Sequence, residues 1–542
     1  MLTFNLIQEP WIRCLNLDGQ VRSVGLADAL ASAQGISEIT DDSPLVVAAL
    51  HRLLLAILHR NLGPRDSDAW GEMWRRGYFP SDVLHSYWEK WGKRFDLFDE
   101  TYPFYQLSSI TETDEPRTTG ILEFHRSSGN NATLADHTTD ARTQGMSPVE
   151  AARALVTHQT FALGGTVGYL KSCEKDADKR ASDAPTARGG VCLLRGTNLF
   201  RTLMLNLAAY DPVENQKDLP CWERETTQGR GERTPDGRVD LFTWQSRRSR
   251  LFCLATNGAN QIAQVKLVPG YHVPLLWNPF QTESMQSFVL KPDAKPEERP
   301  WFQYRITPER SVWRDSSAII HGIDGARRRT LTLDWVAELV ADGELPRDFT
   351  CRLEVLGFAT DQQKVRMWRR EQLPVTAGLL RDQRCREILR SALRLADDTA
   401  FALTSSTEKL AAEMLSPQLE EDQSGKPDPS RVKELARSLG AEVQYWAALT
   451  SPFHGFLEAL GASQRLTDEE ARDAASNAGF EVWKELVHDA ALDSYTRAAS
   501  GVTRNVRGLR AHAIAEAELR HRLAAILKRL LGGDKVASKK QK

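Results

Sequence analysis

The arrangement of apolar residues changes at Pro374, and this change divides the chain in two. Before that point short strand signals alternate with helices, and beyond it the strand signals vanish. Helical periodicity then continues through segments separated by Gly, Pro or Ser residues: 376–416, 429–448, 467–500 and 502–532. Long helices with short connections favour a bundle. The sequence therefore predicts an α+β protein, in which a large mixed α/β N-terminal domain (1–373) precedes a C-terminal bundle of about four helices (374–542) with a basic tail.

Local signals in the N-terminal domain predict one well-defined helix between two polar loops. Ser147 and Glu150 form a capping box with Pro148 at the first helical position, so a helix begins there. It should end near Gly164-Gly165, where the missing Cβ atoms permit a left-handed backbone. A polar loop at 126–137 precedes the helix, and the glycine pair follows it. Loops on a rigid scaffold are common binding sites. We therefore expect a binding site at the ends of this helix.

Two β-hairpins are expected in the same domain. One strand, 251–256, leads into Asn257-Gly258, a dipeptide typical of tight hairpin turns. The other hairpin has strands at 350–359 and 365–374 around a polar tip. Both segments combine apolar strand residues with polar turn residues, which favours antiparallel pairing.

Charge and cysteine content exclude several classes of protein. The 542 residues carry a formal net charge of −2, so any contact with nucleic acid must come from local patches rather than from a uniformly basic surface. The seven cysteines are scattered and form no C-x-x-C pair, which indicates reduced thiols in the cytoplasm and no zinc site. We expect no signal peptide, and no apolar run is long enough to cross a bilayer, since the longest candidate (45–58) is interrupted by His51 and Arg52.

The sequence contains no complete catalytic or cofactor motif. Residues 165–172 approach a phosphate-binding loop, but Leu170 occupies the position where that motif has Gly before Lys. His125, Asp136 and His137 are the candidates for acid–base or metal chemistry, yet no H-E-x-x-H or G-x-S-x-G pattern accompanies them. We therefore expect no catalytic residue, no metal and no cofactor.

Several short motifs occur in an order that is specific to one family. They are Asn5-Leu6-Ile7 with Trp11-Ile12, Pro103-Phe104 with Gln106, the loop 131–134, Gly164-Gly165, Phe242 to Gln245, and the hairpin tip 357–364. Together with the terminal helical bundle, these motifs resemble the large subunit of Cascade, the type I-E CRISPR surveillance complex that carries a guide RNA. The resemblance covers nearly the whole chain.

The resemblance implies a non-catalytic subunit that reads duplex DNA. In that family the subunit recognises the protospacer-adjacent motif from the minor groove, wedges the strands apart to start the R-loop, and helps to recruit the nuclease-helicase. A glycine loop, a lysine and a glutamine-bearing hairpin do this. By position, the motif-binding residues here are Gly164, Gly165, Thr166, Lys266 and Gln362.

The resemblance also assigns a strand wedge and a docking loop. Gln362, flanked by Asp361 and Gln363, corresponds to the wedge. The docking loop contacts the 5′ end of the guide RNA and other Cascade subunits, which include the backbone subunits, the small subunits and the subunit that caps the 5′ handle. Its residues here are Asn131, Ala132, Thr133 and Leu134.

Physical chemistry gives each of these elements a reason. A glycine turn lets the backbone approach base edges that a Cβ atom would keep away. The minor groove presents a degenerate pattern, so a reader placed there should accept several motifs. Unstacking base pairs with a hairpin tip costs about a few kcal/mol per step, and this starts strand opening.

Two other functions remain open from the sequence. A nucleic-acid-cleaving enzyme would use His125, Asp136 and His137, whereas a purely structural scaffold would use its loops to dock neighbouring subunits. Individual residues also have simpler interpretations. Gly164-Gly165 is consistent with an ordinary helix end, Gln362 with a solvated turn, and the basic run 247–250 with either a phosphate contact or a solvated strand edge.

Overall fold

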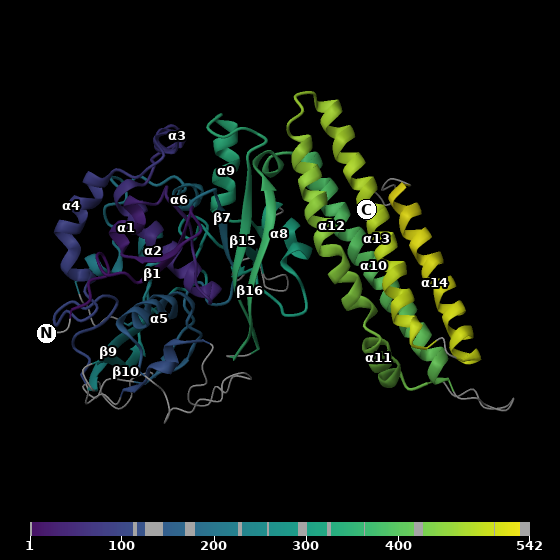
Figure 1. Cartoon of the computed structure of the whole chain (residues 1–542), viewed down its shortest axis with the longest axis horizontal. Helices are drawn as coiled ribbons and strands as arrows, with labels where there is room; N and C mark the ends of the chain where they lie inside the picture. The colour runs from purple at the N-terminus through teal and green to yellow at the C-terminus, as the bar shows by residue number, and fades with distance from the viewer. Residues whose placement is uncertain are drawn as a thin grey trace. The chain divides into compact units, whose positions relative to one another are not determined.

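The computed structural model (Figure 1) describes residues 3–111, 116–124, 145–168, 179–225, 230–256, 259–290, 301–321, 327–361, 364–416, 427–502 and 505–531. The chain divides into two compact units, 1–373 and 374–542. The first unit contains the described strands together with helices, and the second consists of helices that follow the last three residues of the final strand, 374–376. The predicted α+β class is therefore confirmed. The basic tail, 532–542, lies outside the described residues.

Helix α2 (Pro44–Leu62) lies at the centre of the first unit. Sixteen of its 19 residues are buried, so the helix is enclosed on nearly all sides. It packs against α5 (Pro148–Phe161), α7 (Arg238–Phe242) and β15 (Thr350–Asp361). Its buried Arg52 donates two hydrogen bonds, of 2.8 and 2.9 Å, to the carboxylate of Glu283. This bidentate pairing makes a charge acceptable inside the core.

The length of α2 corrects one expectation. By length and composition this helix could cross a membrane, so the statement that no apolar run is long enough is wrong. However, 78% of its apolar window is buried inside the unit. Such burial is typical of the core helix of a folded domain.

Both predicted hairpins are present. Strands β9 (Arg247–Thr256) and β10 (Ala259–Pro269) pair antiparallel, with β4 (Arg117–Thr118) on the other edge of β10. Strand β15 lies between β16 (Lys364–Thr376) and β7 (Val191–Arg195). The remaining strands are short: β1 (Ile12–Asn16), β2 (Val21–Val24), β3 (Ile36–Ile39), β5 (Gly165–Thr166), β6 (Arg180–Ala181), β8 (Gly231–Glu232), β11 (Tyr271–His272), β12 (Phe288–Leu290), β13 (Trp301–Gln303) and β14 (Arg327–Arg328).

The first unit contains six further α-helices among the described residues. They are α1 (Leu26–Ala31), α3 (Ser67–Arg76), α4 (Ser81–Trp91), α6 (Leu199–Asn206), α8 (Ser316–His321) and α9 (Leu331–Ala341). The short η5 (Cys221–Glu223) carries Trp222, which packs against both Phe95 and Phe104 at ring-centroid distances of 5.0 and 5.7 Å. This aromatic cluster joins the N-terminal segment to the middle of the chain.

The second unit is the expected helical bundle. Its helices are α10 (Gln383–Leu415), α11 (Pro429–Ser438), α12 (Ala441–Ser463), α13 (Glu469–Ser500) and α14 (Val506–Leu531). The predicted helix 429–448 is divided at Gly440, whose φ of 71° ends α11. In the core, the Trp483 indole donates a 3.0 Å hydrogen bond to the carbonyl of Ala392, which joins α13 to α10.

A buried carboxylate fixes the base of the β15–β16 hairpin. Glu354 in β15 accepts hydrogen bonds from Arg195 (2.6 Å), Arg370 (2.7 Å) and Gln372 (2.9 Å). Burial alone would raise the pKa of Glu354, but the Arg195 guanidinium and the hydrogen bonds from Gln372 and Arg370 lower the pKa to about 2. The carboxylate therefore stays ionised and joins three strands.

Replacing Glu354 with Gln should lower the free energy of unfolding by about 3 kcal/mol, because the buried Arg195 and the partly exposed Arg370 then lose their nearest carboxylate. Both guanidinium groups then retain the more distant Glu38 carboxylate, at 3.6 and 3.5 Å. Urea unfolding of the full chain at pH 7 measures this. Since the folded-state pKa lies below the ordinary 4.5, the contribution of Glu354 is complete above about pH 4.5 and is lost as the pH falls toward 2.

The control for this measurement is Glu89→Gln, which changes an exposed carboxylate that lies 3.3 Å from the His85 imidazole. Exposed pairs of this kind contribute little to stability. If both variants unfold at the same urea concentration, Glu354 does not stabilise the hairpin as described.

Candidate nucleic-acid interface

The segment Ala162–Gly168, which we call the glycine loop, follows helix α5. The predicted capping box is present, since the Ser147 hydroxyl accepts from the Glu150 amide (3.3 Å) and the Glu150 carboxylate accepts from the Ser147 amide (2.8 Å). The helix ends at Phe161, where the Ala162 amide donates to the His158 carbonyl (2.9 Å). The loop therefore leaves the rigid end of a helix.

The glycine loop is fixed by the segment 179–184. The Gly164 amide donates to the Asp183 carboxylate, and the Val167 amide donates to the Lys179 carbonyl (2.9 Å). Between these contacts, β5 pairs antiparallel with β6. Gly165 and Thr166 are nevertheless exposed. The loop thus combines an ordered backbone with two residues that face solvent.

The glycines of this loop have different roles. A Cβ atom on Gly164 would lie 3.1 Å from the Asp183 carboxylate, whereas a Cβ on Gly165 would have no neighbour within 4 Å. Gly168 has a φ of +127°, and neither Gly164 nor Gly165 is left-handed. The interpretation that a left-handed Gly164-Gly165 pair ends the helix is therefore wrong. The strained position is Gly168, three residues further on.

Lys266 lies directly beside the glycine loop. It belongs to β10, its side chain is buried, and its Nζ atom would be 3.2 Å from a Cβ atom on Gly168. A glycine at 168 thus leaves room for the ammonium group. The structure therefore brings together four of the five positions that the resemblance assigned to motif binding: Gly164, Gly165, Thr166 and Lys266.

Arg247 holds the glycine loop in place, and the sequence alone does not indicate this role. Its guanidinium donates to the carbonyls of Leu163 and Ser182, and burial lowers its pKa to about 10. It is 2% exposed, so it faces neither phosphate nor solvent, and both interpretations of it are wrong. A run of arginines in the sequence gives no sign of which one is buried.

The remaining predicted site residues lie outside the described part of the chain. These are Gln362 and Gln363, the docking loop Asn131, Ala132, Thr133 and Leu134, and the candidate enzyme residues His125, Asp136 and His137. Asp361 ends β15 and Lys364 begins β16, so the wedge position follows directly from a strand. Convergence of Gln362 with the glycine loop stays a prediction.

Histidine and metal chemistry find no support in the described residues. No group of three His, Cys, Asp or Glu side chains there is placed to hold a metal ion. His158, in the last turn of helix α5, is fully buried. Burial is the main cause that lowers its pKa to about 3, and the positive charge of Arg247 contributes as well. His158 is therefore neutral in the folded protein and stacks on Phe124 at 5.8 Å.

Known proteins share this architecture along nearly their whole length. The CRISPR-associated protein CasA/Cse1 of Thermus thermophilus is 33% identical over 525 residues, which cover 95% of this chain and 96% of that protein. The crystal structure of CasA from Thermus thermophilus superposes with a TM-score of 0.77 at 30% identity, covering 97% of this chain and 100% of that chain. Both comparisons extend through the two units.

Two more distant structures share the fold. Cse1 from Acidimicrobium ferrooxidans has a TM-score of 0.81 at 24% identity, covering 98% of this chain and 99% of that chain. A chain of a CRISPR RNA-guided surveillance complex has a TM-score of 0.73 at 18% identity, covering 96% and 100%. The fold thus defines a class of CRISPR-associated proteins with an α+β unit and a helical bundle.

The model of the family "CRISPR-associated protein Cse1" matches residues 5–494. The chain belongs to this family. The resemblance to the large Cascade subunit, which the motifs indicated, is thereby confirmed.

Gly168→Ala should lower the free energy of unfolding by roughly 1–3 kcal/mol, because alanine rarely adopts a φ of +127° and its methyl group would contact Lys266. Thermal and urea unfolding of the full chain measure the change. The matched control is Gly165→Ala in the same loop, where the methyl group meets open space. Equal stability of the two variants would contradict the assigned role of Gly168.

His158→Phe should make the stability of the protein less dependent on pH. Below pH 6.5 the unfolded chain protonates this histidine, but the folded chain does so only near pH 3. Stability is therefore complete above pH 6.5 and falls as the pH decreases, by about 2 kcal/mol between pH 7 and pH 5. The phenylalanine variant should lose that contribution in urea unfolding at the two pH values.

The exposed His85→Gln variant is the control and should retain the pH dependence of the wild type. An unchanged pH dependence in His158→Phe would show that the buried imidazole does not resist protonation.

Proposed function

We propose that this chain is the non-catalytic subunit of an RNA-guided CRISPR surveillance complex that recognises the protospacer-adjacent motif in duplex DNA and starts R-loop formation. Membership of the Cse1 family supports a role in such a complex. The single observation that carries the finer proposal is the glycine loop, which exposes Gly165 and Thr166. Asp183 and Arg247 fix the N-terminal side of this loop, and the hydrogen bond from Val167 to Lys179 fixes the other end.

The exposed part of the loop suits the minor groove. Because Gly165 has no side chain, its backbone N–H and C=O groups can come close to base edges in a narrow groove. Lys179 and Arg180 are exposed beside the loop and Lys266 lies under it. The exposed cations, Lys179 and Arg180, suit the phosphates that flank the groove, whereas Lys266 is buried. Phosphate contacts fix the register of a protein on DNA.

The β15–β16 hairpin supplies the proposed wedge. Gln362, with Asp361 and Gln363, would enter the base stack next to the motif and separate the first base pairs. The tip can separate base pairs only if the rest of the hairpin stays in place. Glu354, with its three donors, provides that fixed point. The guide RNA would then supply most of the sequence specificity through base pairing.

Partners and compartment follow from the same proposal. The loop from Asn131 to Leu134 would dock on the 5′ end of the guide RNA and on neighbouring subunits, and the assembled complex would recruit the nuclease-helicase. The described cysteines are free thiols: Cys14, Cys192, Cys221, Cys253, Cys351 and Cys385. Free thiols suit the reducing cytoplasm, where such a complex would meet invading DNA.

The test is binding of the reconstituted guide-RNA complex to target duplexes that differ in the flanking motif alone. Gly165→Leu should weaken binding to the preferred duplex by about tenfold or more, because its side chain keeps the backbone from the groove, while binding of the complex to guide RNA is unchanged. The control is Gly35→Leu, at an exposed glycine of the same unit where an added Cβ makes ordinary contact.

Gln362→Ala separates motif reading from strand opening. It should retain binding to the motif and reduce R-loop formation, followed by a fluorescent base placed next to the motif. If Gly165→Leu and Gln362→Ala both behave as wild type, the chain is a structural scaffold. If the purified chain cleaves labelled duplex in the presence of a divalent metal, the enzyme alternative replaces this proposal.

A further inference from the structure

A cavity of about 390 Å³ in the first unit combines aromatic rings with arginines. Its volume falls within the range of small-molecule sites in proteins. The wall includes Tyr102, Tyr105, Trp222 and Tyr271, together with Arg94 and Arg248. Tyr102 is 37% exposed, so the cavity opens to solvent at that side. None of the residues proposed to bind DNA contributes to it.

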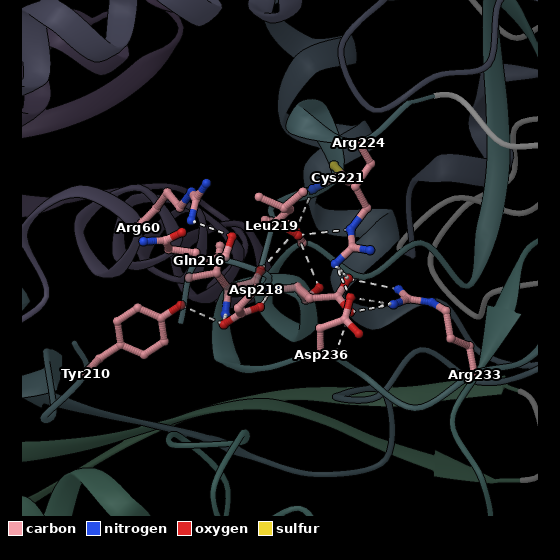
Figure 2. A network of polar contacts seen from close by, with 12 residues as sticks. Arg60, Tyr210, Gln216, Asp218, Leu219, Cys221, Arg224, Arg233 and Asp236 are labelled. Atoms are coloured by element: carbon pink, nitrogen blue, oxygen red, sulfur yellow. Dashed lines mark hydrogen bonds and ion pairs between the residues drawn. The ribbon is translucent and has the colours of Figure 1, made fainter. Parts of the chain in front are cut away.

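The carboxylates in the wall of the cavity already bind other groups. Figure 2 shows Arg224 and Arg233 pointing toward the same acidic group, which includes Asp236. Arg233 donates hydrogen bonds of 2.7 and 2.8 Å to Asp240, and Arg224 lies 3.4 Å from the same carboxylate. These two arginines are therefore neutralised.

The other wall carboxylate with a buried side chain is also satisfied. Glu223 accepts from Arg60 (2.8 Å) and from the hydroxyl of Tyr87 (2.6 Å). Glu225, in contrast, lies at the exposed rim. The wall thus has no buried carboxylate left for a further cation.

Arg94 and Arg248 have a different environment. The Arg94 guanidinium lies 3.3 Å from the ring centroid of Tyr102, and that of Arg248 lies 5.0 Å from the centroid of Tyr271. No carboxylate of the described residues forms a salt bridge with either arginine. Arg248 donates to the amide oxygen of Gln245, and its Nε atom is buried without a hydrogen-bond partner. Within the described part of the chain, two cations over aromatic rings therefore lack an anion.

Tyr105, which lines this cavity, has a strained backbone conformation. Tyr105 is the one non-glycine residue with positive φ (57°) in the described part of the chain. Gln106 keeps it there, because its side chain donates to the Leu97 carbonyl (2.8 Å) and accepts from the Leu251 amide (2.8 Å). Strained residues of this kind cluster at ligand sites. The Pro103-to-Gln106 motif of the sequence thus acquires a structural role.

We propose that this cavity binds one nucleotide, with the base against the tyrosine rings and the phosphate on Arg94 and Arg248. Every base has a π-face that stacks on an aromatic ring, and guanidinium groups bind phosphate through charge-assisted hydrogen bonds. The nucleotide is either a free nucleoside monophosphate or one residue of a single strand. The inference does not depend on the glycine loop, because Arg247 and Arg248 point to opposite faces of β9.

The experiment is isothermal titration of the full chain with adenosine 5′-monophosphate, inorganic phosphate or a five-nucleotide RNA. We expect saturable binding of the monophosphate with a Kd of about 1 mM or tighter. Arg94→Gln and Tyr102→Leu should each weaken it by about tenfold. The matched control is Arg201→Gln, since Arg201 stacks on Trp74 at 3.8 Å but does not line the cavity.

The probes separate the two sources of the nucleotide. Tighter binding of the RNA than of the monophosphate, with the loss in Arg94→Gln preserved, assigns a strand, and weaker binding assigns a free nucleotide. The proposal is overturned if the monophosphate does not saturate, if phosphate alone binds as tightly, or if Arg94→Gln and Arg201→Gln behave alike while both retain the melting temperature of the wild type.

Discussion

The first unit depends on arginine side chains that are buried together with their hydrogen-bond acceptors. A guanidinium group has five N–H donors in one plane, so it can satisfy acceptors from several segments at once. Arg52 joins α2 to Glu283, and Arg247 joins the glycine loop to Ser182. Because an unsatisfied buried acceptor costs about 1–3 kcal/mol, each arginine favours one arrangement of irregular backbone. This matters in a unit where many of the strands are only two or three residues long.

A glycine loop fixed in this way is preorganised. Asp183 binds the amide of Gly164, and pairing with β6 orders Gly165 and Thr166. A preorganised loop loses less conformational entropy on binding than a flexible one. In the minor groove few hydrogen-bonding groups distinguish one base pair from another, so a reader depends on the width and shape of the groove as well. Reading shape requires a loop that keeps its position, and buried contacts provide this better than an exposed glycine-rich segment alone.

The features that the sequence predicts are those determined by residues close together in the chain. The capping box at Ser147, the strands around the Asn257-Gly258 turn and the periodicity of the bundle are local signals, and the structure confirms the corresponding elements. The residue with positive φ was not predicted by local signals. It is Gly168, which lies beside Lys266 of β10, and not a residue of the Gly164-Gly165 pair. The burial of Arg247 was also not predictable, since its acceptors lie 65 and 84 positions away.

Alternation of side chains along β9 gives one strand two functions. Arg247 donates to the Leu163 carbonyl of the glycine loop, whereas the next residue, Arg248, lies in the wall of the cavity. A ligand bound at one face of β9 can change binding at the opposite face only if the strand has two positions and the ligand prefers one of them. However, β9 forms ten residue pairs with β10, and its end is closed by the hydrogen bond from the Gly270 amide to the Ser246 carbonyl (3.0 Å). A strand paired along its whole length favours a single position, so contacts at its two faces should contribute independently.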